Sequence, residues 1–181
     1  MLRTTANRIT VIRILLVPVF LLLCYGGARI PALFVFLIAS LTDMADGYIA
    51  RHYNQISAFG KFMDPLADKI LVMAAMCYFV EVGRIPGWAL AVVLLREFAV
   101  SGLRMVAVEQ GLVIAAGWSG KVKTAATMVC LCLMLLIRPP EPWESAPDLI
   151  AVISTAVILI TTVYSGAEYF WKNRDVFRHA D

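Results

Sequence analysis

Charged residues are scarce in this chain of 181 residues. They make up 16% of it, against about 25% in an average soluble domain, while hydrophobic residues make up 61% and the mean hydropathy is +0.79. A soluble core of this size cannot enclose so much apolar surface, whereas a lipid bilayer acts as a solvent for it. The composition therefore excludes an ordinary soluble globular protein and predicts an integral membrane protein.

The chain also lacks a strongly basic surface and the cysteine spacing of a disulfide framework or a zinc site. Its formal net charge is only +3, from 16 Lys and Arg against 13 Asp and Glu, which argues against a nucleic-acid partner. None of its cysteines forms a C-x-x-C pair. We expect buried free thiols at all four positions, which are Cys24, Cys77, Cys130 and Cys132.

Six apolar stretches of roughly the 20 residues that a spanning helix needs are separated by short breaks rich in Gly, Pro or polar residues. They are Ile9–Tyr25, Ile30–Ala50, Asp64–Val82, Ile85–Val108, Lys121–Ile137 and Leu149–Phe170. The predicted fold is an all-α integral membrane protein with six transmembrane helices in a single domain, residues 1–181. A cleaved secretory signal is the alternative for the first stretch, but Arg13 interrupts the apolar run and favours a retained helix.

Lysine and arginine are unevenly divided between the two alternating sets of loops. Nine lie in one set, namely Arg3, Arg8, Arg51, Lys61, Lys121, Lys123, Lys172, Arg174 and Arg178, and three in the other, namely Arg29, Arg84 and Arg138. The positive-inside rule then predicts a multi-pass protein of the inner (cytoplasmic) membrane with both termini in the cytoplasm.

Four aspartates lie in the second and third predicted spans, near the cytoplasmic side. Asp43 and Asp46 stand at i and i+3, and Asp64 and Asp68 at i and i+4, so each pair shares one helix face. If the two faces converge, repulsion between the carboxylates requires either protonation or a bound cation. Oxygen ligands favour Mg²⁺ or Mn²⁺ over zinc.

Structural ion pairs within the bundle are the alternative explanation for these aspartates. Lys69, Arg96 and Arg104 also fall inside predicted spans, and charges within a membrane pair with one another. Ion pairing does not account for Gly47, directly after Asp46, or for Gly60, one turn before Asp64. Glycines at such places let a backbone or a ligand approach closely.

The whole segment reads Asp43-x2-Asp46-Gly47-x2-Ala50-Arg51-x8-Gly60-x3-Asp64-x3-Asp68. At every fixed position it resembles the motif of the CDP-alcohol phosphotransferase family of membrane enzymes. The resemblance implies a six-helix membrane fold, usually dimeric, with a polar cavity that faces the cytoplasm and a divalent metal site. It also implies a reaction in which the hydroxyl of an acceptor alcohol displaces CMP from a CDP-linked donor.

The resemblance assigns a role to each motif residue. One or two Mg²⁺ or Mn²⁺ ions are held by Asp43, Asp46, Asp64 and Asp68. Asp68 also serves as the general base on the acceptor hydroxyl. The CDP part of the donor is bound by Gly47, Ala50, Arg51 and Gly60, with Arg51 on the diphosphate.

A second group of charged residues indicates which alcohol is the acceptor. Arg104, Lys121 and Lys123 are three cations toward the cytoplasmic side, and they predict a site for an acceptor that carries its own phosphate. The two lysines start a helix, where the helix dipole also favours an anion. The alternative is that these lysines are ordinary positive-inside anchors.

Two segments in this region narrow the resemblance to one branch of the family. Arg-Glu-Phe-x-Val-Ser-Gly-x-Arg, from Arg96, and Gly-Lys-x-Lys-Thr, from Gly120, are similar to segments of the branch that makes phosphatidylglycerophosphate from CDP-diacylglycerol and sn-glycerol 3-phosphate. The run Asn7-Arg8-Ile9-Thr10-x2-Arg13 resembles that branch as well. Thr127 departs from it, because many relatives carry glutamine there.

Several alternatives remain open at this point. The same chemistry with another acceptor, such as phosphatidylglycerol, serine or an inositol phosphate, fits the aspartate motif equally well. A divalent-cation carrier is disfavoured because the latter half of the chain holds no second copy of that motif. Arg96 and Glu97 are adjacent, so we expect them to point in different directions and Glu97 to pair with another buried cation as a scaffold. Lys69, next to Asp68, is expected to be such a partner of Glu97 or to tune the pKa of Asp68.

Overall fold

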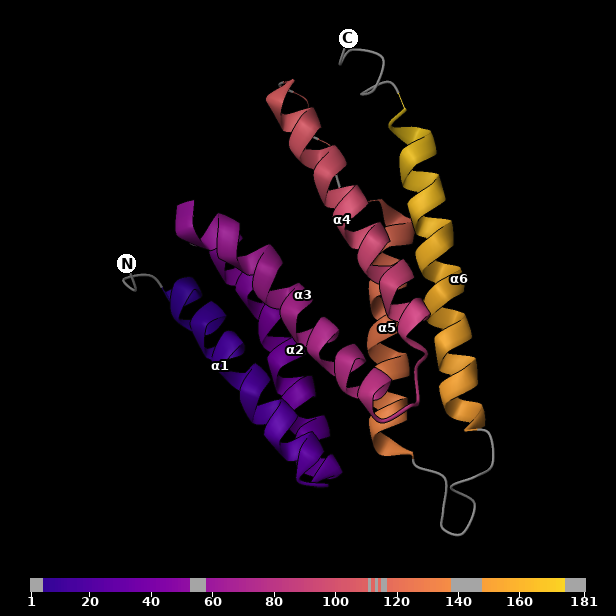
Figure 1. Cartoon of the computed structure of the whole chain (residues 1–181). Coiled ribbons are helices and arrows are strands. Elements are labelled where there is room, and N and C mark those ends of the chain that lie inside the picture. The colour runs from indigo at the N-terminus through magenta and orange to yellow at the C-terminus, as the bar shows by residue number, and fades with distance from the viewer. Residues whose placement is uncertain are drawn as a thin grey trace. The chain divides into compact units, whose positions relative to one another are not determined.

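The structure is a computed structural model. It describes the backbone of residues 5–52, 58–110, 112, 114, 117–137 and 148–174, and the side chains of residues 11–42, 69–108, 110, 112, 114, 117–137 and 148–174. This described part of the chain contains six α-helices and no strand (Figure 1). The helices are α1 (Thr5–Tyr25), α2 (Arg29–His52), α3 (Ala58–Glu81), α4 (Gly87–Glu109), α5 (Trp118–Leu136) and α6 (Leu149–Lys172).

Each of the six predicted stretches is helical, and the main differences from the predicted bounds lie at the amino-terminal ends of the helices. α1 begins at Thr5 rather than Ile9, and α3 begins at Ala58 rather than Asp64. Hydropathy locates where an apolar stretch begins, whereas the helix begins where backbone hydrogen bonding begins. The two boundaries separate where the first turn of a helix is polar, as it is in α1, which begins Thr-Ala-Asn-Arg.

Glycine ends two of the helices, as the sequence predicted. Gly27 and Gly83 have φ of +75° and +73°, a left-handed conformation that other residues rarely adopt. At the end of α1, the Ala28 amide donates to the Leu23 carbonyl (2.9 Å) and the Gly27 amide donates to the Cys24 carbonyl (3.1 Å). These paired bonds are the Schellman motif that closes a helix carboxyl end.

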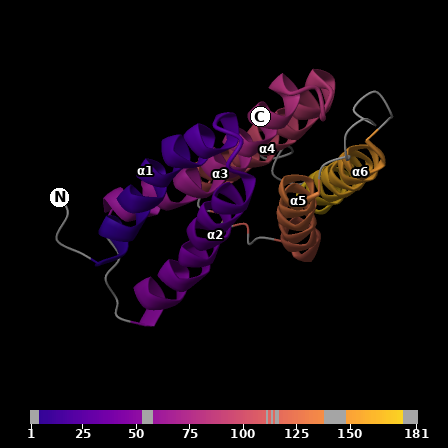
Figure 2. The same cartoon turned by 90° about the horizontal axis from the view of Figure 1, so that it is seen from below.

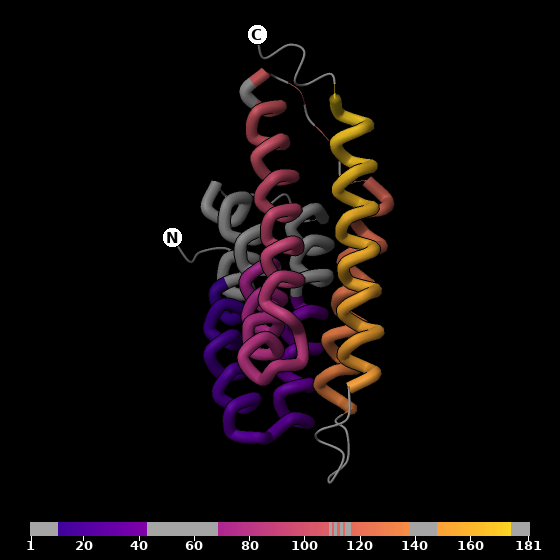
Figure 3. The backbone as a smooth tube through the Cα atoms, turned by 45° about the vertical axis from the view of Figure 1, so that its right-hand side comes forward, coloured from indigo at the N-terminus to yellow at the C-terminus, as the bar shows by residue number. Residues whose placement is uncertain are grey.

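The chain forms two compact units, and each is described by itself. Residues 1–81 and 135–138 form the first unit, and residues 82–134 and 139–181 form the second. In the first unit, α1 packs against both α2 and α3, and α2 runs opposite to them (Figures 1 and 2). In the second unit, α4 and α6 run side by side in the same direction, and α5 runs opposite to them (Figure 3). The end of α2 therefore shares one end of its unit with the start of α3.

Aromatic and small side chains form the core of the first unit. The rings of Phe20 and Phe36 are fully buried, with centroids 5.6 Å apart, and they join α1 to α2. At the end remote from the aspartate motif, the Tyr25 hydroxyl donates to Glu81, and the Tyr25 and Tyr78 rings meet edge to face at 5.4 Å. This polar aromatic cluster joins the carboxyl ends of α1 and α3.

Arg84 joins three segments at one end of the second unit. Its Nε donates to the Asp148 carboxylate at 2.5 Å, and its Nη1 donates to the Met134 carbonyl near the end of α5. Asp148 in turn caps α6, because its side chain accepts from the Ala151 amide at 3.1 Å. One arginine thus links the loop before α4 to the end of α5 and the start of α6.

α6 is more polar on its buried face than on its exposed face. It buries a stripe that includes Ser154, Thr162 and Ser165, while it exposes large apolar residues such as Ile160 and Val163. On α4, Glu97 is buried and its neighbour Phe98 is 72% exposed, although the other buried residues of this helix are apolar. A soluble protein shows the opposite pattern, whereas helices in lipid bury their polar and small residues against one another.

Two helices in the described part of the chain, α5 and α6, are long and apolar enough to cross a membrane. α1 and α2 contain shorter apolar segments, Val11–Tyr25 and Arg29–Thr42. α4 has the length but contains Arg96, Glu97 and Arg104. Such charges lower the hydropathy of a helix without excluding it from a membrane, provided that they are buried against other helices.

The cysteines are free, as predicted, but one prediction about them is wrong. Cys24 and Cys130 are buried and Cys132 is half-buried, whereas Cys77 is exposed. We predicted burial because Cys77 lies in an apolar run. In a helix whose outward face is itself apolar, that run does not tell the buried side from the exposed one.

We predict that Asp148 stabilises the second unit in two separable ways. Asp148→Ala removes both the cap of α6 and the partner of Arg84, and should lower the free energy of unfolding in detergent by about 2–3 kcal/mol. Asp148→Asn retains a capping oxygen and loses only the charge, so its loss should be about 1 kcal/mol smaller. Detergent denaturation followed by circular dichroism would measure both. Equal losses in the two variants would show that the cap contributes nothing.

Candidate functional site

The aspartate motif lies on continuous helix. Asp43 and Asp46 belong to the second half of α2, and Asp64 and Asp68 to the first half of α3, so the i, i+3 and i, i+4 spacings place each pair on one helix face. α2 and α3 contact each other, and the motif occupies the end of the first unit where they meet. The side chains of residues 43–51 and 60–68 lie outside the described residues, so the convergence of the carboxylates stays a prediction.

The remaining motif residues follow the same helices. Gly47, Ala50 and Arg51 extend along α2 beyond Asp46, and Gly60 is in the first turn of α3. A backbone without large side chains at three of these four positions suits a flat ligand lying against the helices. Four carboxylates on two contacting helices also form a donor set suited to Mg²⁺ or Mn²⁺.

A buried ion network occupies the second unit. The Lys123 ammonium donates to Glu97 Oε1 at 2.5 Å, and Arg96 Nη1 donates to the same oxygen at 2.9 Å. Arg96 Nη2 donates to the Ser165 hydroxyl at 2.6 Å. These contacts link α4, α5 and α6, and we call the four residues the Glu97 network. Lys123 is only 6% exposed, so its charge is neutralised largely by Glu97.

The network confirms one prediction and contradicts another. Glu97 does pair with a buried cation, Lys123, as the sequence indicated. The expectation that Arg96 and Glu97 point apart is wrong, because the Arg96 guanidinium contacts the neighbouring carboxylate. Neighbouring Cα–Cβ bonds on a helix diverge, but a long arginine side chain can curl back far enough to pair.

Two glycines provide space for Arg96. A Cβ atom at Gly166 would lie 3.2 Å from Arg96 Cγ, which is a tight contact, and a Cβ at Gly120 would lie 3.7 Å from Nη2, which is an ordinary one. A larger residue at Gly166 of α6 would therefore require the Arg96 stem to shift slightly. Thr127 uses its buried hydroxyl within α5, donating to the Lys123 carbonyl at 2.9 Å.

The other two predicted phosphate ligands are exposed. Lys121 lies on the first turn of α5 and Arg104 on the last third of α4. Arg104 Nε donates to the Tyr169 hydroxyl of α6 at 3.0 Å, and its guanidinium carbon lies 5.5 Å from the centre of the Tyr169 ring. Because α4 and α5 run in opposite directions, the end of α4 and the start of α5 share one end of the second unit.

Sequence reasoning missed Ser165 and Tyr169. They stand at i and i+4 on α6, and that spacing on an otherwise apolar helix is a signal that both occupy one face. The spacing does not identify their partners. Ser165 contacts Arg96, and Tyr169 contacts Arg104.

Comparisons with known proteins identify relatives over nearly the whole chain. The family model for CDP-alcohol phosphatidyltransferase matches residues 3–165. A Bacillus subtilis (strain 168) protein named CDP-diacylglycerol--glycerol-3-phosphate 3-phosphatidyltransferase is 40% identical over 95% of this chain and 96% of its own length. A Mycobacterium tuberculosis protein named probable phosphatidylglycerophosphate synthase is 38% identical over 91% of this chain and 78% of its own length. An Escherichia coli (strain K12) protein with the same name as the Bacillus relative is 36% identical, over 89% and 90%.

We predict that the Glu97 network is a structural requirement of the second unit. Glu97→Ala leaves two buried cations without their carboxylate and should cost about 3–5 kcal/mol of unfolding free energy, measured by denaturation in detergent. Glu168→Gln is the matched control. Glu168 pairs with Lys172, four residues on, at an exposed site of α6, so its loss should be small. Similar losses in the two variants would contradict the structural role of Glu97.

Proposed function

The chain belongs to the CDP-alcohol phosphatidyltransferase family, and from that premise we propose that it transfers the phosphatidyl group of CDP-diacylglycerol to sn-glycerol 3-phosphate. The products are phosphatidylglycerophosphate and CMP. The observation that carries the proposal is the likeness of nearly the whole chain to relatives named for this reaction. The aspartate motif on the contacting helices α2 and α3 supports the general chemistry, and the exposed cations of α4 and α5 support a phosphorylated acceptor.

The proposal includes a multi-pass membrane protein with six spans, a polar cavity open to the cytoplasm and both termini in the cytoplasm. Support comes from the nine-to-three division of Lys and Arg between the loops and from the polar buried face of α6. The opposite directions of successive helices within each unit fit alternate crossings of a bilayer. A homodimer is what the family resemblance implies.

At the aspartate motif, we assign Asp43, Asp46, Asp64 and Asp68 to one or two divalent ions, Mg²⁺ or Mn²⁺. Bound there, such an ion neutralises the charge of the donor diphosphate and of the departing CMP. Asp68 accepts the proton of the acceptor hydroxyl as its oxygen attacks the lipid-bearing phosphorus, and the bond from that phosphorus to the CMP oxygen breaks.

The CDP part of the donor is assigned to the small residues beside the aspartates. Gly47, Ala50 and Gly60 leave room for the nucleotide against the helix backbone, and Arg51 binds the diphosphate through its planar fork of donors. CDP-diacylglycerol enters from the bilayer, because its two acyl chains are as apolar as the exposed faces of the helices.

The phosphate of glycerol 3-phosphate is assigned to Arg104, Lys121 and Lys123. Arg104 and Lys121 are exposed and therefore accessible to a ligand from the cytoplasm. Lys123 is paired with Glu97 at 2.5 Å, so it contributes to phosphate binding only by sharing its charge between two anions. The main electrostatic contribution is accordingly expected from Arg104 and Lys121.

The reaction itself is the first prediction of this proposal. Purified protein with CDP-diacylglycerol, labelled glycerol 3-phosphate and Mg²⁺ or Mn²⁺ should release CMP and form labelled phosphatidylglycerophosphate, and a chelator should stop both.

Asp68→Asn should abolish turnover and leave the folded protein intact in detergent, because asparagine cannot accept the hydroxyl proton. Product formed by Asp68→Asn at the full rate would refute the base assignment, and CMP release only with serine, phosphatidylglycerol or an inositol phosphate would refute the acceptor.

Neutralising the exposed cations tests the acceptor site separately from the metal site. Arg104→Gln and Lys121→Gln should each raise the KM for glycerol 3-phosphate about tenfold, because each removes a charge-assisted contact to phosphate. The KM for CDP-diacylglycerol should stay near its original value. Steady-state kinetics with each substrate varied in turn would measure this, and an unchanged acceptor KM in both variants would count against a phosphate site at this end of the second unit.

A further inference from the structure

Tyr169 contacts Arg104 in two ways at once. Its hydroxyl accepts from Arg104 Nε at 3.0 Å, and the centre of its ring lies 5.5 Å from the guanidinium carbon, within the range of a cation–π contact. A hydrogen bond at one edge and a ring nearby restrict both the position of the guanidinium group and the direction of its plane. Arg104 is on α4 and Tyr169 on α6, so the contact also crosses between helices.

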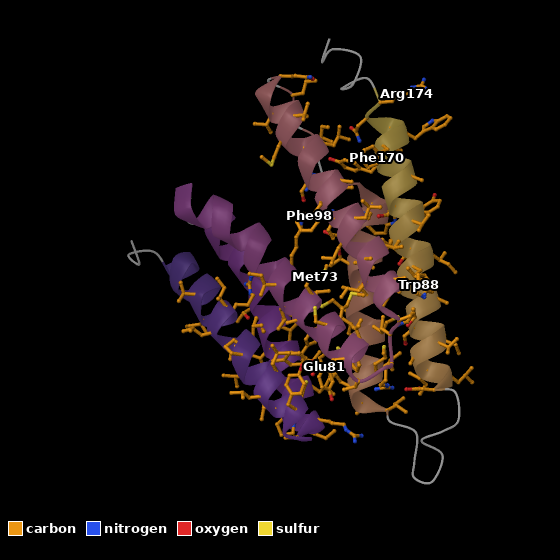
Figure 4. All side chains as sticks on the ribbon, viewed as in Figure 1. Met73, Glu81, Trp88, Phe98, Phe170 and Arg174 are labelled. Atoms are coloured by element: carbon orange, nitrogen blue, oxygen red, sulfur yellow. The ribbon has the colours of Figure 1, made fainter. Side chains whose placement is uncertain are left out.

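The ring that holds Arg104 is itself firmly placed. Tyr169 is 6% exposed and belongs to a buried cluster with Val100, Leu103 and Ala107 of α4. Phe170 packs against this cluster, and Figure 4 shows its side chain extending from α6 toward α4. The Asn173 side chain donates to the Tyr169 carbonyl at 2.7 Å at the carboxyl end of α6. The cluster and the helix end together fix the ring.

The contact with Tyr169 orients Arg104 and leaves most of its donors available. A guanidinium has five N–H donors, and the Tyr169 hydroxyl uses only the one on Nε. No other described residue hydrogen-bonds to Arg104 or pairs with it, and its side chain is exposed. Its two Nη groups therefore remain for a planar, bidentate contact of the kind that phosphate accepts.

A neutral partner preserves the charge of Arg104. A carboxylate at the same place would orient the guanidinium but would also neutralise it, as Glu97 does for Lys123. A tyrosine hydroxyl and a π face give direction without a countercharge. An arginine held in this way binds an anion at a smaller cost in side-chain entropy than a freely rotating one.

We propose that Tyr169 is a positioning residue of the acceptor site, which holds the Arg104 guanidinium in the orientation that receives the phosphate of the acceptor alcohol. This inference rests on the proposed function, because it takes Arg104 as a phosphate ligand. Tyr169 does not contact the acceptor in this scheme. It acts through Arg104 alone, and therefore on the binding of one substrate.

Two substitutions at Tyr169 separate the hydrogen bond from the ring. Tyr169→Phe removes the hydroxyl and keeps the ring in its apolar cluster, and should raise the KM for glycerol 3-phosphate about threefold. Tyr169→Leu removes both contacts and should raise it about tenfold. In both variants kcat and the KM for CDP-diacylglycerol should remain unchanged. Tyr164→Phe is the matched control, because Tyr164 is on the same helix, 66% exposed, and should leave all constants unchanged.

A double-mutant cycle with Arg104→Gln distinguishes positioning from a general structural effect. Once Arg104 is neutralised, Tyr169→Phe should raise the acceptor KM no further. A further rise of the same size in the Arg104→Gln protein would overturn the proposal, as would a fall in kcat or a higher KM for CDP-diacylglycerol in Tyr169→Phe. If Arg104→Gln raises the acceptor KM and neither Tyr169 variant does, the positioning role fails while the acceptor site stands. If Arg104→Gln leaves the acceptor KM unchanged, the assigned acceptor site fails, and the positioning role fails with it.

Discussion

The arrangement of the second unit depends on the ion pairs that the Glu97 carboxylate makes with Lys123 and Arg96. This carboxylate lies on α4 among apolar helices and receives hydrogen bonds from Lys123 of α5 and from Arg96, which in turn reaches Ser165 of α6. An unpaired charge at such depth costs several kcal/mol, so each of these groups requires the others. α5 and α6 must therefore lie close enough to α4 for Lys123 to contact Glu97 and for Ser165 to contact Arg96. Gly166 fits the same arrangement, because a Cβ atom there would lie 3.2 Å from the Arg96 stem and displace it slightly.

Helix association in a bilayer has to rely on such contacts. Lipid tails are as apolar as leucine, so burying a leucine between two helices gives little gain over leaving it in lipid. The free energy that favours helix association therefore comes from close packing of small residues and from polar pairs. The first unit uses mainly packing: Ala32, Ala39 and Ala75 are fully buried, and the buried Phe20 and Phe36 rings contact each other. The second unit also uses polar pairs, to which the Ser165 hydroxyl on the buried face of α6 belongs.

The sequence predicted the helices well because each is an apolar run bounded by glycine, proline or charge. It predicted that Glu97 needs a buried cation, since the cost of an isolated charge is independent of the fold. It could not identify Lys123, which is 26 positions away on another helix, because partner choice depends on helix packing. Exposure of Cys77 was unpredictable for a related reason, since both the buried and the exposed faces of α3 contain apolar residues. The aspartate motif was recognisable from spacing alone, because a helix turns the i, i+3 and i, i+4 intervals directly into a shared face.

The cations of the second unit divide into two kinds according to what holds them. Lys123 is buried, Arg96 is half-buried, and the two share one carboxylate. Glu97 largely neutralises their charge, so an incoming anion would have to compete with Glu97 at contact distance. Arg104 is exposed and is held by a hydroxyl and an aromatic ring, neither of which carries charge. In a region of low dielectric this difference decides which groups attract an anion, because a cation already neutralised exerts little field beyond its own partner. Sequence alone groups these residues as similar basic positions near one side of a membrane. The structure separates them by the charge of their partners. Lys123 and Arg96 pair with a carboxylate and stabilise the helix packing, whereas Arg104 has a neutral partner and keeps its charge for an anion.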